Sequence, residues 1–390
     1  MNYLIIGNGI AGVEAAQTIR RNDSDSTITI ISQSKHLHYY RPRIIEYLAN
    51  KVSLDQITIY KDDFYIKNNI NNILDTKIVS IEPDSKQVID SNGNSYTYDK
   101  LLMATGSAPF VPPIEGVETQ GIFTLKGASD ADNILSYCEN ISDVIVIGGG
   151  LLGLETANSL SSIGKNVTVI ELAKWLLPRQ LDKEGGDILQ EILMKKGILF
   201  QTDASVSQIS SENNKVTGIT LKSGKEINGN VIIISAGIKP EVHKPLFSIF
   251  ESNRGIKVSD TLATSIRDIY AAGDLVEHNG IVYGLWDASK EQGKIAGLNM
   301  CGINTQYVGT TMASQLKITG IDLYSAGNIY ESDAKNYVLK DKESYLKFLI
   351  KDEQPVGAIV LGKKDAIKLA RNVMNKKNHH DDFIKLFSIK

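Results

Sequence analysis

A glycine-rich turn occurs twice in this chain. The first turn is Gly7-Asn8-Gly9-Ile10-Ala11-Gly12, and the second turn is Gly148-Gly149-Gly150-Leu151-Leu152-Gly153. In such a turn the first glycine permits a tight bend, the second lets backbone approach a pyrophosphate, and the third lets a helix pack on a strand. Free N–H groups and the positive end of the helix dipole then bind the phosphates. The repetition predicts two dinucleotide sites, and therefore two cofactors that can exchange electrons.

The residues around both turns have the strand–turn–helix pattern that such a site requires. Short apolar strands are predicted at Asn2–Ile6 and Asp143–Ile147, directly before the turns. A helical pattern follows each turn and carries a glutamate at the same offset, Glu14 and Glu155. This context supports the dinucleotide interpretation of both copies, and their duplication argues against a chance match.

A second repeated pattern follows each turn by about 90 residues, which indicates two similar α/β units. Leu101–Pro109 and Ile232–Pro240 both run from apolar residues into small residues, glycine and proline. Between the turn and this exit strand, each unit contains short alternating segments joined by Asn-Gly or Ser-Gly turn signals. The strands predicted there are Lys77–Ile81, Gln87–Asp90, Ser95–Tyr98, Ser205–Ser210, Val216–Leu221 and Glu226–Asn228.

A third landmark, Thr264–Asp274, is predicted to be a strand that ends in Gly-Asp, with a helix following at Asp287–Met300. Beyond Gly309 the composition changes to short strands and a lysine-rich helix, which indicates a separate small domain. The strands expected there are Gln315–Ile318, Tyr345–Ile350 and Gly357–Leu361.

The predicted fold class is α/β, with two Rossmann-like, three-layer dinucleotide-binding domains that carry small β excursions, and a small α+β C-terminal domain. The first domain is discontinuous and comprises residues 1–108 and 233–309. The second comprises residues 109–232, and the C-terminal domain comprises residues 310–390.

Composition excludes several other classes of protein. The net charge of −3 gives no general attraction to nucleic acid, and no apolar run reaches the roughly 18 residues of a membrane helix. No secretory signal precedes the first strand, and two cysteines argue against a disulfide scaffold. His36 and His38 lack a third ligand at metal spacing. We therefore expect a cytoplasmic protein without a metal site and without nucleic-acid or membrane partners.

Taken together, the two turns, Ala104-Thr105-Gly106 and Tyr270-Ala271-Ala272-Gly273-Asp274 resemble the FAD-dependent pyridine-nucleotide oxidoreductases of the two-dinucleotide-domain type. Within that superfamily, three shorter strings look most like clostridial-type NADH:rubredoxin oxidoreductases. These strings are Tyr39-Tyr40-Arg41-Pro42-Arg43, Arg179-Gln180-Leu181-Asp182 and Leu316-Lys317-Ile318-Thr319-Gly320-Ile321. The resemblance implies that FAD binds in the first domain and NADH in the second.

For FAD, the resemblance places Arg41 along the flavin or its phosphates and Asp274 on the ribitol chain, although Asp274 also suits a helix N-cap. Trp286 either walls the flavin or nicotinamide or belongs to the core. Strand Thr27–Ile31 is not followed by the acid expected for the ribose, so Gln33 or Ser34 substitutes as a neutral partner, or FAD is held more weakly. The implied FAD site is Gly7, Gly9, Ile10, Ala11, Gly12, Gln33, Ser34, Lys35, Arg41, Val79, Ala104, Thr105, Gly106, Asp274 and Trp286.

For NADH, strand Val167–Ile170 is followed by Glu171, at the position where an acid binds the adenosine ribose 2′-hydroxyl. A carboxylate there repels a 2′-phosphate, and Lys174 alone does not replace an arginine cluster, so NADH is expected to be preferred over NADPH. The implied NAD site is Gly148, Gly150, Leu152, Gly153, Glu171 and Gly237.

Glu155 is the one candidate catalytic residue. In one interpretation it matches the family's glutamate near nicotinamide and flavin. In the other it is a first-turn acid that complements the helix dipole, and the sequence favours neither interpretation over the other. No cysteine occurs in Tyr39–Ile45, Cys138 and Cys301 suit packing, and His379-His380 does not match the His-Glu dyad of disulfide reductases. A thiol relay is therefore not expected.

Electrons are then expected to pass from flavin to an external one-electron acceptor, with rubredoxin the first choice. An NADH oxidase that reduces O2 is the alternative, and a flavin-based NADH sensor is a more distant one. Basic residues near the C-terminus either steer a small acidic carrier or form a solvated face. They are Lys363, Lys364, Lys368, Arg371, Lys376 and Lys377. A monomer is favoured, and a dimer stays open.

Overall fold

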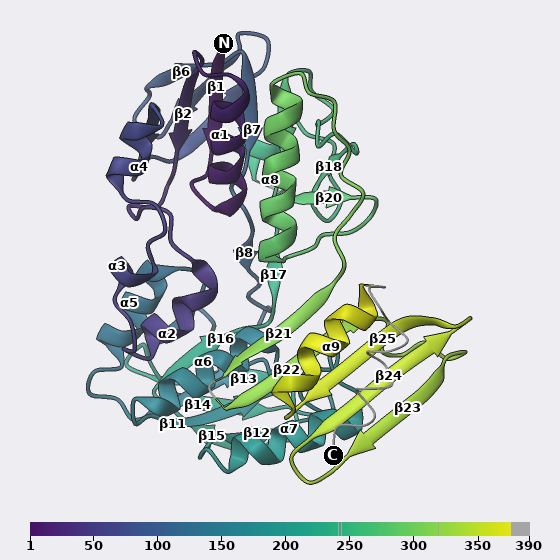
Figure 1. Cartoon of the computed structure of the whole chain (residues 1–390). Coiled ribbons are helices and arrows are strands. Elements are labelled where there is room, and N and C mark those ends of the chain that lie inside the picture. Colours follow the sequence, from purple (N-terminus) through teal and green to yellow (C-terminus); the bar gives the residue numbers. More distant parts are fainter. Residues whose placement is uncertain (241, 243, 319, 376–390) are drawn as a thin grey trace. The chain divides into compact units, whose positions relative to one another are not determined.

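The computed structural model describes residues 1–240, 242, 244–318 and 320–375, and these divide into two compact units (Figure 1). The first unit comprises Met1–Ile44, Val52–Ala108 and Ile238–Thr310. The second unit comprises Ile45–Lys51, Pro109–Gly237 and the chain from Thr311 onward. The chain therefore leaves the first unit and returns to it twice.

The first unit is built on a five-stranded parallel sheet in the order β19-β7-β1-β2-β3. Its strands are β1 (Asn2–Ile6), β2 (Thr27–Ile31), β3 (Ile70–Ile73), β7 (Lys100–Met103) and β19 (Ile269–Ala271). Helix α1 (Ile10–Asn22) lies against α8 (Trp286–Met300), and their backbones come very close. A Cβ on Gly293 would lie 2.2 Å from the Ala11 carbonyl oxygen, so this crossing requires glycine.

The smaller elements of the first unit lie around this sheet. As predicted, a three-stranded antiparallel sheet interrupts the fold, with β4 (Ile78–Glu82), β5 (Gln87–Asp90) and β6 (Ser95–Thr97). Ile78 on β4 packs in one apolar cluster with Ile6 and Ile31, the last residues of β1 and β2. The remaining elements are η1 (Arg41–Arg43), α3 (Leu54–Ile57), α4 (Asp62–Lys67), η2 (Pro245–Phe247), β18 (Ile256–Val258) and β20 (Val276–His278).

The second unit repeats this parallel order, reading β9-β16-β10-β11-β12. Its strands are β9 (Ile122–Thr124), β10 (Asp143–Ile147), β11 (Asn166–Ile170), β12 (Leu199–Gln201) and β16 (Val231–Ile234). An antiparallel excursion again follows, with β13 (Val206–Glu212), β14 (Lys215–Leu221) and β15 (Glu226–Asn228). The helices are α2 (Ile44–Leu48), α5 (Ala128–Tyr137), α6 (Leu151–Ser162) and α7 (Lys183–Met194). Two short strands, β8 (Ala108–Pro109) and β17 (Ile238–Lys239), pair with each other where the chain passes from one unit to the other, and β17 belongs to the first unit.

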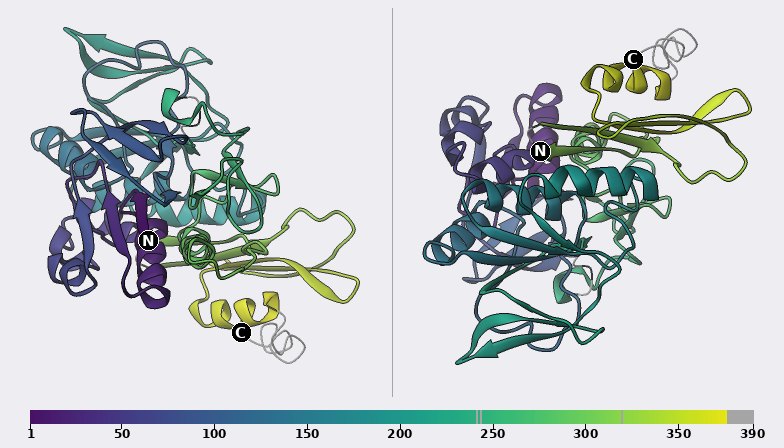
Figure 2. Two further views of the ribbon diagram at one scale, coloured as in Figure 1. Left: turned by 90° about the horizontal axis from the view of Figure 1, so that it is seen from above. Right: turned by 90° about the horizontal axis from the view of Figure 1, so that it is seen from below.

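The C-terminal segment forms a five-stranded antiparallel sheet in the order β21-β22-β25-β24-β23. The strands are β21 (Ala313–Ile318), β22 (Ile321–Gly327), β23 (Lys335–Lys340), β24 (Tyr345–Lys351) and β25 (Gln354–Leu361). Helix α9 (Lys364–Met374) covers one face of this sheet (Figure 2). Its Ala370 shares an apolar cluster with Phe348 and Val360 of the sheet. The prediction for this segment lacked β22 and β23.

The C-terminal sheet is fixed to α7 and to the residues that precede it. Asp182 caps α7 and also accepts hydrogen bonds from the Tyr345 hydroxyl, at 2.8 Å, and the Lys347 ammonium, at 2.9 Å. The Tyr330 hydroxyl donates to the Leu181 carbonyl at 2.7 Å. By its contacts the segment therefore belongs to the same compact unit as Pro109–Gly237.

Among the described residues, no helix is both long enough and apolar enough to cross a membrane.

The predicted strand at Thr264–Asp274 is wrong over its first half. Only Ile269–Ala271 forms a strand. Asp268 has a φ of +66°, in the left-handed region that a strand does not use. The Thr264 hydroxyl also accepts a hydrogen bond from the Ile266 backbone, at 3.1 Å, in a local turn. This turn delivers the chain to the edge of the sheet beside β7.

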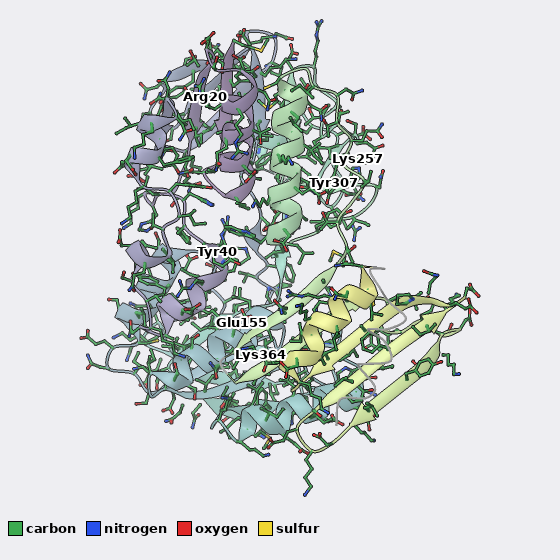
Figure 3. All side chains as sticks on the ribbon, in the orientation of Figure 1. Arg20, Tyr40, Glu155, Lys257, Tyr307 and Lys364 are labelled. Atoms are coloured by element: carbon green, nitrogen blue, oxygen red, sulfur yellow. The ribbon has the colours of Figure 1, made fainter. Side chains whose placement is uncertain are left out.

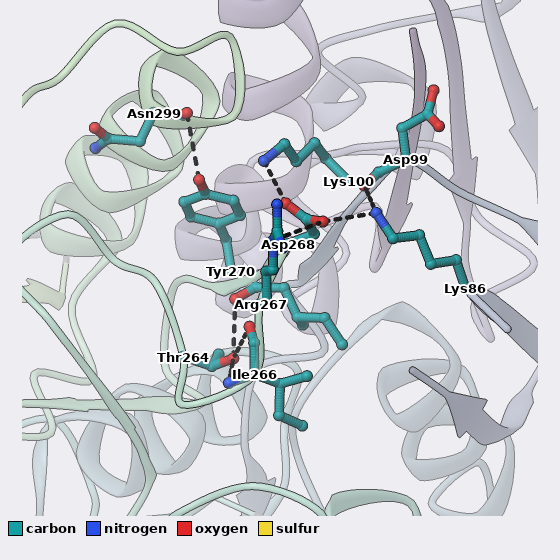
Figure 4. Close-up of polar contacts among 10 residues, drawn as sticks. Lys86, Asp99, Lys100, Thr264, Ile266, Arg267, Asp268, Tyr270 and Asn299 are labelled. Atoms are coloured by element: carbon teal, nitrogen blue, oxygen red, sulfur yellow. Dashed lines mark hydrogen bonds and ion pairs between the residues drawn. The ribbon is translucent and has the colours of Figure 1, made fainter. Parts of the chain in front are cut away.

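Asp268 joins three parts of the first unit (Figure 4). Its carboxylate lies 2.5 Å from the Lys100 ammonium, at the start of β7, and 2.6 Å from that of Lys86, between β4 and β5. Its carbonyl accepts from the Leu101 amide at 3.0 Å. Hydrogen bonds from Lys100 and Lys86 lower the pKa of Asp268 to about 2. Because its side chain is only 13% exposed, we expect this cluster to contribute to stability.

Asp268→Asn should lower the free energy of unfolding by about 1–2 kcal/mol at pH 7, since it leaves two lysines without their shared counter-ion. A depressed pKa stabilises the fold above pH 4, and this contribution is lost as the pH falls toward 2. Urea unfolding at pH 7 and at pH 3 should therefore show a difference that shrinks in acid. Asp63→Asn, which removes an exposed pair with Lys67, is the control and should change stability little. A difference of equal size at both pH values would contradict the assignment.

Candidate functional site: two dinucleotide turns

The first turn follows β1 and opens α1, with Gly9 at the N-cap. A Cβ on Gly7, which has a φ of +118°, would lie 2.2 Å from the Ala104 carbonyl oxygen. A Cβ on Gly12 would lie 2.0 Å from the Gly7 carbonyl oxygen. No side chain caps Gly9, so the amides at the start of α1 are available to an anion. The geometry thus explains Gly7 and Gly12 and the nearness of the Ala104 exit strand.

Other predicted residues gather at the first turn. The Arg41 guanidinium lies 4.0 Å from the position of a Cβ on Gly9. A Cβ on Gly273 would lie 3.3 Å from the Ala11 side chain, which brings the Gly-Asp landmark to the start of α1. Asp274 accepts a hydrogen bond from the Ser289 hydroxyl at 3.0 Å. Its interpretation as a helix N-cap is wrong, because it precedes strand β20 and α8 begins at Trp286.

An aromatic column stands beside Arg41. His38, which is 3% exposed, stacks on Tyr60 at 5.6 Å and on Trp286 at 5.8 Å, measured between ring centroids. The ring of Tyr40, which is labelled in Figure 3, meets the Trp286 indole edge-on, with 5.0 Å between the ring centroids. Burial lowers the pKa of His38 to about 4, so the ring is neutral at pH 7, and its Nδ1 lies 3.2 Å from the Asn8 carbonyl. His38 is thus buried within aromatic packing. No group of three or more metal-ligating side chains occurs among the described residues.

The two turns differ at the residue that directly follows the second strand of each unit, where an acid that binds ribose is expected. Ser32 follows β2 as Glu171 follows β11. The Ser32 hydroxyl accepts from the Ser34 amide at 3.2 Å, and the Glu171 carboxylate accepts from the Ala173 amide at 2.6 Å. Ser32 therefore has the register of the acid, whereas the side chains of Gln33, Ser34 and Lys35 are exposed. Their predicted contacts with FAD, like that of Val79 on β4, stay predictions.

Asn8 is a residue of the first turn that sequence reasoning missed. It occupies the position of Gly149, where a Cβ would lie 2.9 Å from a Glu171 carboxylate oxygen. In the first turn this space contains a carboxamide, whose oxygen accepts from the Tyr65 hydroxyl at 2.9 Å. The pair Asn8 and Ser32 thus replaces glycine and glutamate. The signal in the sequence was an asparagine opposite a glycine in an otherwise repeated motif.

The second turn has the same backbone geometry as the first. A Cβ on Gly148 would lie 2.3 Å from the Ser235 carbonyl oxygen, and one on Gly153 would lie 2.0 Å from that of Gly148. Glu171 accepts from the Gly149 amide at 2.6 Å, which fixes the carboxylate against the turn. Gly237, in the exit strand's turn, has a φ of +110°. The predicted NAD residues from Gly148 to Glu171 therefore lie around one turn, and their binding of NAD stays a prediction.

Glu155 lies in the middle of α6, as Figure 3 shows, and its side chain is only 8% exposed. The interpretation as a first-turn acid is wrong, because α6 starts at Leu151 and has no acid in its first turn. Glu14 on α1 has the same place and likewise lies outside the first turn. A buried carboxylate near a nucleotide-binding turn keeps the catalytic interpretation of Glu155 as a prediction.

The remaining candidates are thiols and basic residues. Both cysteines are free, with Cys138 buried and Cys301 partly buried, and burial raises the pKa of each thiol. They therefore have the character of packing residues. On α9, Lys364, Lys368 and Arg371 are exposed. Lys376, Lys377, His379 and His380 lie outside the described residues.

Comparison with known proteins gives two family matches. Residues 1–293 match the family described as pyridine nucleotide-disulphide oxidoreductase. Residues 313–378 match the domain described as the C-terminal domain of rubredoxin NAD+ reductase. The first match spans both dinucleotide turns, and the second covers the C-terminal sheet from β21 to β25 together with α9.

Individual relatives agree with these matches. An NADH-rubredoxin oxidoreductase of Clostridium acetobutylicum is 34% identical over 360 residues, which cover 92% of this chain and 90% of the relative. The crystal structure of NADH:rubredoxin oxidoreductase from the same organism has a TM-score of 0.81 and 31% identity, covering 98% of this chain and 99% of that one. A nitrite reductase [NAD(P)H] of Bacillus subtilis is 35% identical over 364 residues, 92% of this chain.

The chain spans only 45% of the length of that nitrite reductase, so the activity of the longer protein is not transferred to it. The match over residues 1–293 nevertheless covers most of the chain and includes every dinucleotide-binding element described above. The chain belongs to the pyridine nucleotide-disulphide oxidoreductase family.

Proposed function

We propose that the protein is an FAD-dependent NADH oxidoreductase that delivers electrons to a small one-electron carrier protein, with rubredoxin as the expected carrier. The observation that carries this proposal is the pair of dinucleotide turns with matching backbones and different ribose positions. Two turns with the same side chains would suit two copies of one nucleotide. Because the second turn has Gly149 and Glu171 where the first has Asn8 and Ser32, we expect the two turns to bind two different nucleotides.

The residues of the first turn suit FAD. Uncapped amides at the start of α1 and the nearby Arg41 cation complement a pyrophosphate. Asp274, at the mouth of the same turn, offers a carboxylate to hydroxyls such as those of a ribitol chain. When bound there, FAD supplies a two-electron acceptor for hydride that also releases electrons singly.

The residues of the second turn suit NADH. The amides at the start of α6 are likewise uncapped, and Glu171 is held against the turn at the position for a ribose hydroxyl. The buried Glu155, on the same helix, is the residue we expect to orient the nicotinamide. Hydride transfer itself requires alignment rather than a protein acid or base.

The carrier proposal rests on two supports. The only two cysteines of the sequence are free, buried or partly buried, and raised in pKa, which disfavours a thiol relay and favours direct electron release. The relative in Clostridium acetobutylicum is named for rubredoxin and is covered over nearly its whole length. A Methanocaldococcus jannaschii relative named NADH oxidase, 31% identical over 343 residues, supports O2 as the second candidate acceptor. A monomer is the expected state.

The deciding experiment reduces the purified protein with NADH without air and then mixes it with rubredoxin or with O2. We expect a yellow protein whose flavin absorbance bleaches with NADH and recovers much faster with rubredoxin than with air. Faster recovery with air would favour the oxidase. NADH-dependent dimerisation with negligible turnover would favour a sensor, and a protein that binds no flavin would end the proposal altogether.

The nucleotide preference is tested at Glu171. Glu171→Ala combined with Leu172→Arg should lower kcat/KM for NADH by about tenfold or more, because a charged hydrogen bond to ribose is lost. The new arginine should raise activity with NADPH, since Leu172 is 71% exposed and adjacent to the acid. Leu172→Ala is the control and should leave the preference unchanged. A wild-type protein that already prefers NADPH would refute the role of Glu171.

The basic face of α9 is tested by charge reversal. Lys364→Glu with Lys368→Glu should slow reduction of an acidic carrier about tenfold at low salt and leave reduction of a small dye intact, since steering acts on charged partners. Lys335→Glu with Lys342→Glu, elsewhere on the same sheet and its loops, matches the change in net charge. If both double variants behave alike, α9 is a solvated face and not a docking surface.

A further inference from the structure

The segment Ile45–Lys51 belongs to the second unit, although the chain on both sides of it belongs to the first. Its apolar side chains are buried, with Ile45 4%, Leu48 0% and Ala49 7% exposed. The segment is thus a short piece of chain that packs in the second unit and separates two stretches of the first unit in the sequence. Its helix, α2, follows η1 directly.

Two side-chain hydrogen bonds hold this segment. The Ser159 hydroxyl, on α6, donates to the Ile45 carbonyl at 2.8 Å, and the Ser159 side chain is buried. The Tyr47 hydroxyl donates to the Asp132 carboxylate, on α5, at 2.5 Å. That hydrogen bond, together with burial, raises the pKa of Tyr47 to about 12. These two hydrogen bonds fix the position of the segment, in addition to the burial of Leu48.

The same stretch of chain lies beside the first turn and is hydrogen-bonded to the helix that follows the second turn. At its start, Arg41 lies beside Gly9 of the first turn. Only three residues separate Arg41 from Ile45, which is held by Ser159. Ser159 in turn lies on α6, one helical turn beyond Glu155, and Gly150 of the second turn is the N-cap of this helix. One end of this stretch lies beside the first turn, and the other is hydrogen-bonded to the helix that the second turn opens. Such a stretch is suited to couple the two sites.

We propose that residues 41–51 couple the two dinucleotide sites, with Ser159 and Tyr47 as positioning residues for Arg41. A nucleotide at the second turn restrains α6 from its N-terminus, and Ser159 on the same helix transmits this restraint to Ile45. A pyrophosphate at the first turn orders Arg41. Because each ligand restricts the same stretch, binding of one lowers the entropic cost of binding the other.

This inference rests on the proposed function, and its test separates the two. The affinity of the flavin-free protein for FAD is measured by fluorescence quenching, with and without saturating NAD+, which binds without reducing the flavin. In wild-type protein we expect NAD+ to tighten FAD binding about fivefold or more. By linkage, FAD must tighten NAD+ binding by the same factor.

Ser159→Ala should bring this factor close to one while changing the affinity for FAD alone less than about twofold. Tyr47→Phe should lower the factor in the same way and gives a second, independent test if one variant folds poorly. Ser162→Ala is the matched control, because the hydroxyl of this serine of α6 also donates to a carbonyl, at 2.7 Å, but to that of Ser159 within the helix. It should keep the wild-type factor.

Independent binding of FAD and NAD+ to wild-type protein would overturn the coupling and leave the proposed function standing. An unchanged factor in both Ser159→Ala and Tyr47→Phe would likewise overturn it. Loss of FAD binding in wild-type protein would instead contradict the proposed function.

Discussion

The architecture depends on two places where backbone touches backbone without a side chain between. At Gly7 and Gly148 a Cβ would lie 2.2 Å and 2.3 Å from a carbonyl oxygen of the neighbouring exit strand. This approach lets each helix start directly above the end of its parallel strand, where its amides are uncapped. The parallel sheets, the positions of Ala104 and Ser235, and the predicted cofactor sites all follow from that geometry.

Equal backbones leave the choice of ligand to a few side chains. In the second turn, Glu171 takes the space that the missing side chain of Gly149 leaves. In the first turn, the Asn8 side chain fills that space and accepts a hydrogen bond from Tyr65. The Ser32 hydroxyl makes only the local hydrogen bond with the Ser34 amide. A carboxylate placed to bind a ribose hydroxyl suits a nucleotide that binds and dissociates in each catalytic cycle. A neutral, enclosed turn with a nearby arginine suits a cofactor that stays.

Much of this was readable in the sequence because local patterns set it. Glycine spacing, apolar strands and Asn-Gly turns predicted the central strands of both parallel sheets and both antiparallel excursions. No local pattern predicted the outer strands β3, β9 and β12. Reasoning failed where the outcome depended on distant partners. The left-handed Asp268 is stabilised by Lys86 and Lys100, far away in the chain, and it breaks a strand that its own neighbours favour. The assignment of Ile45–Lys51 to the second unit depends on Ser159 and Asp132, which no local pattern reveals.

The most direct measurement of the central claim is native mass spectrometry of the purified chain, alone and with NAD+. Two turns that hold different dinucleotides predict one FAD per chain as isolated and one additional NAD+ when it is supplied, with the FAD retained. Displacement of FAD by NAD+, or two molecules of the same nucleotide on one chain, would contradict the account.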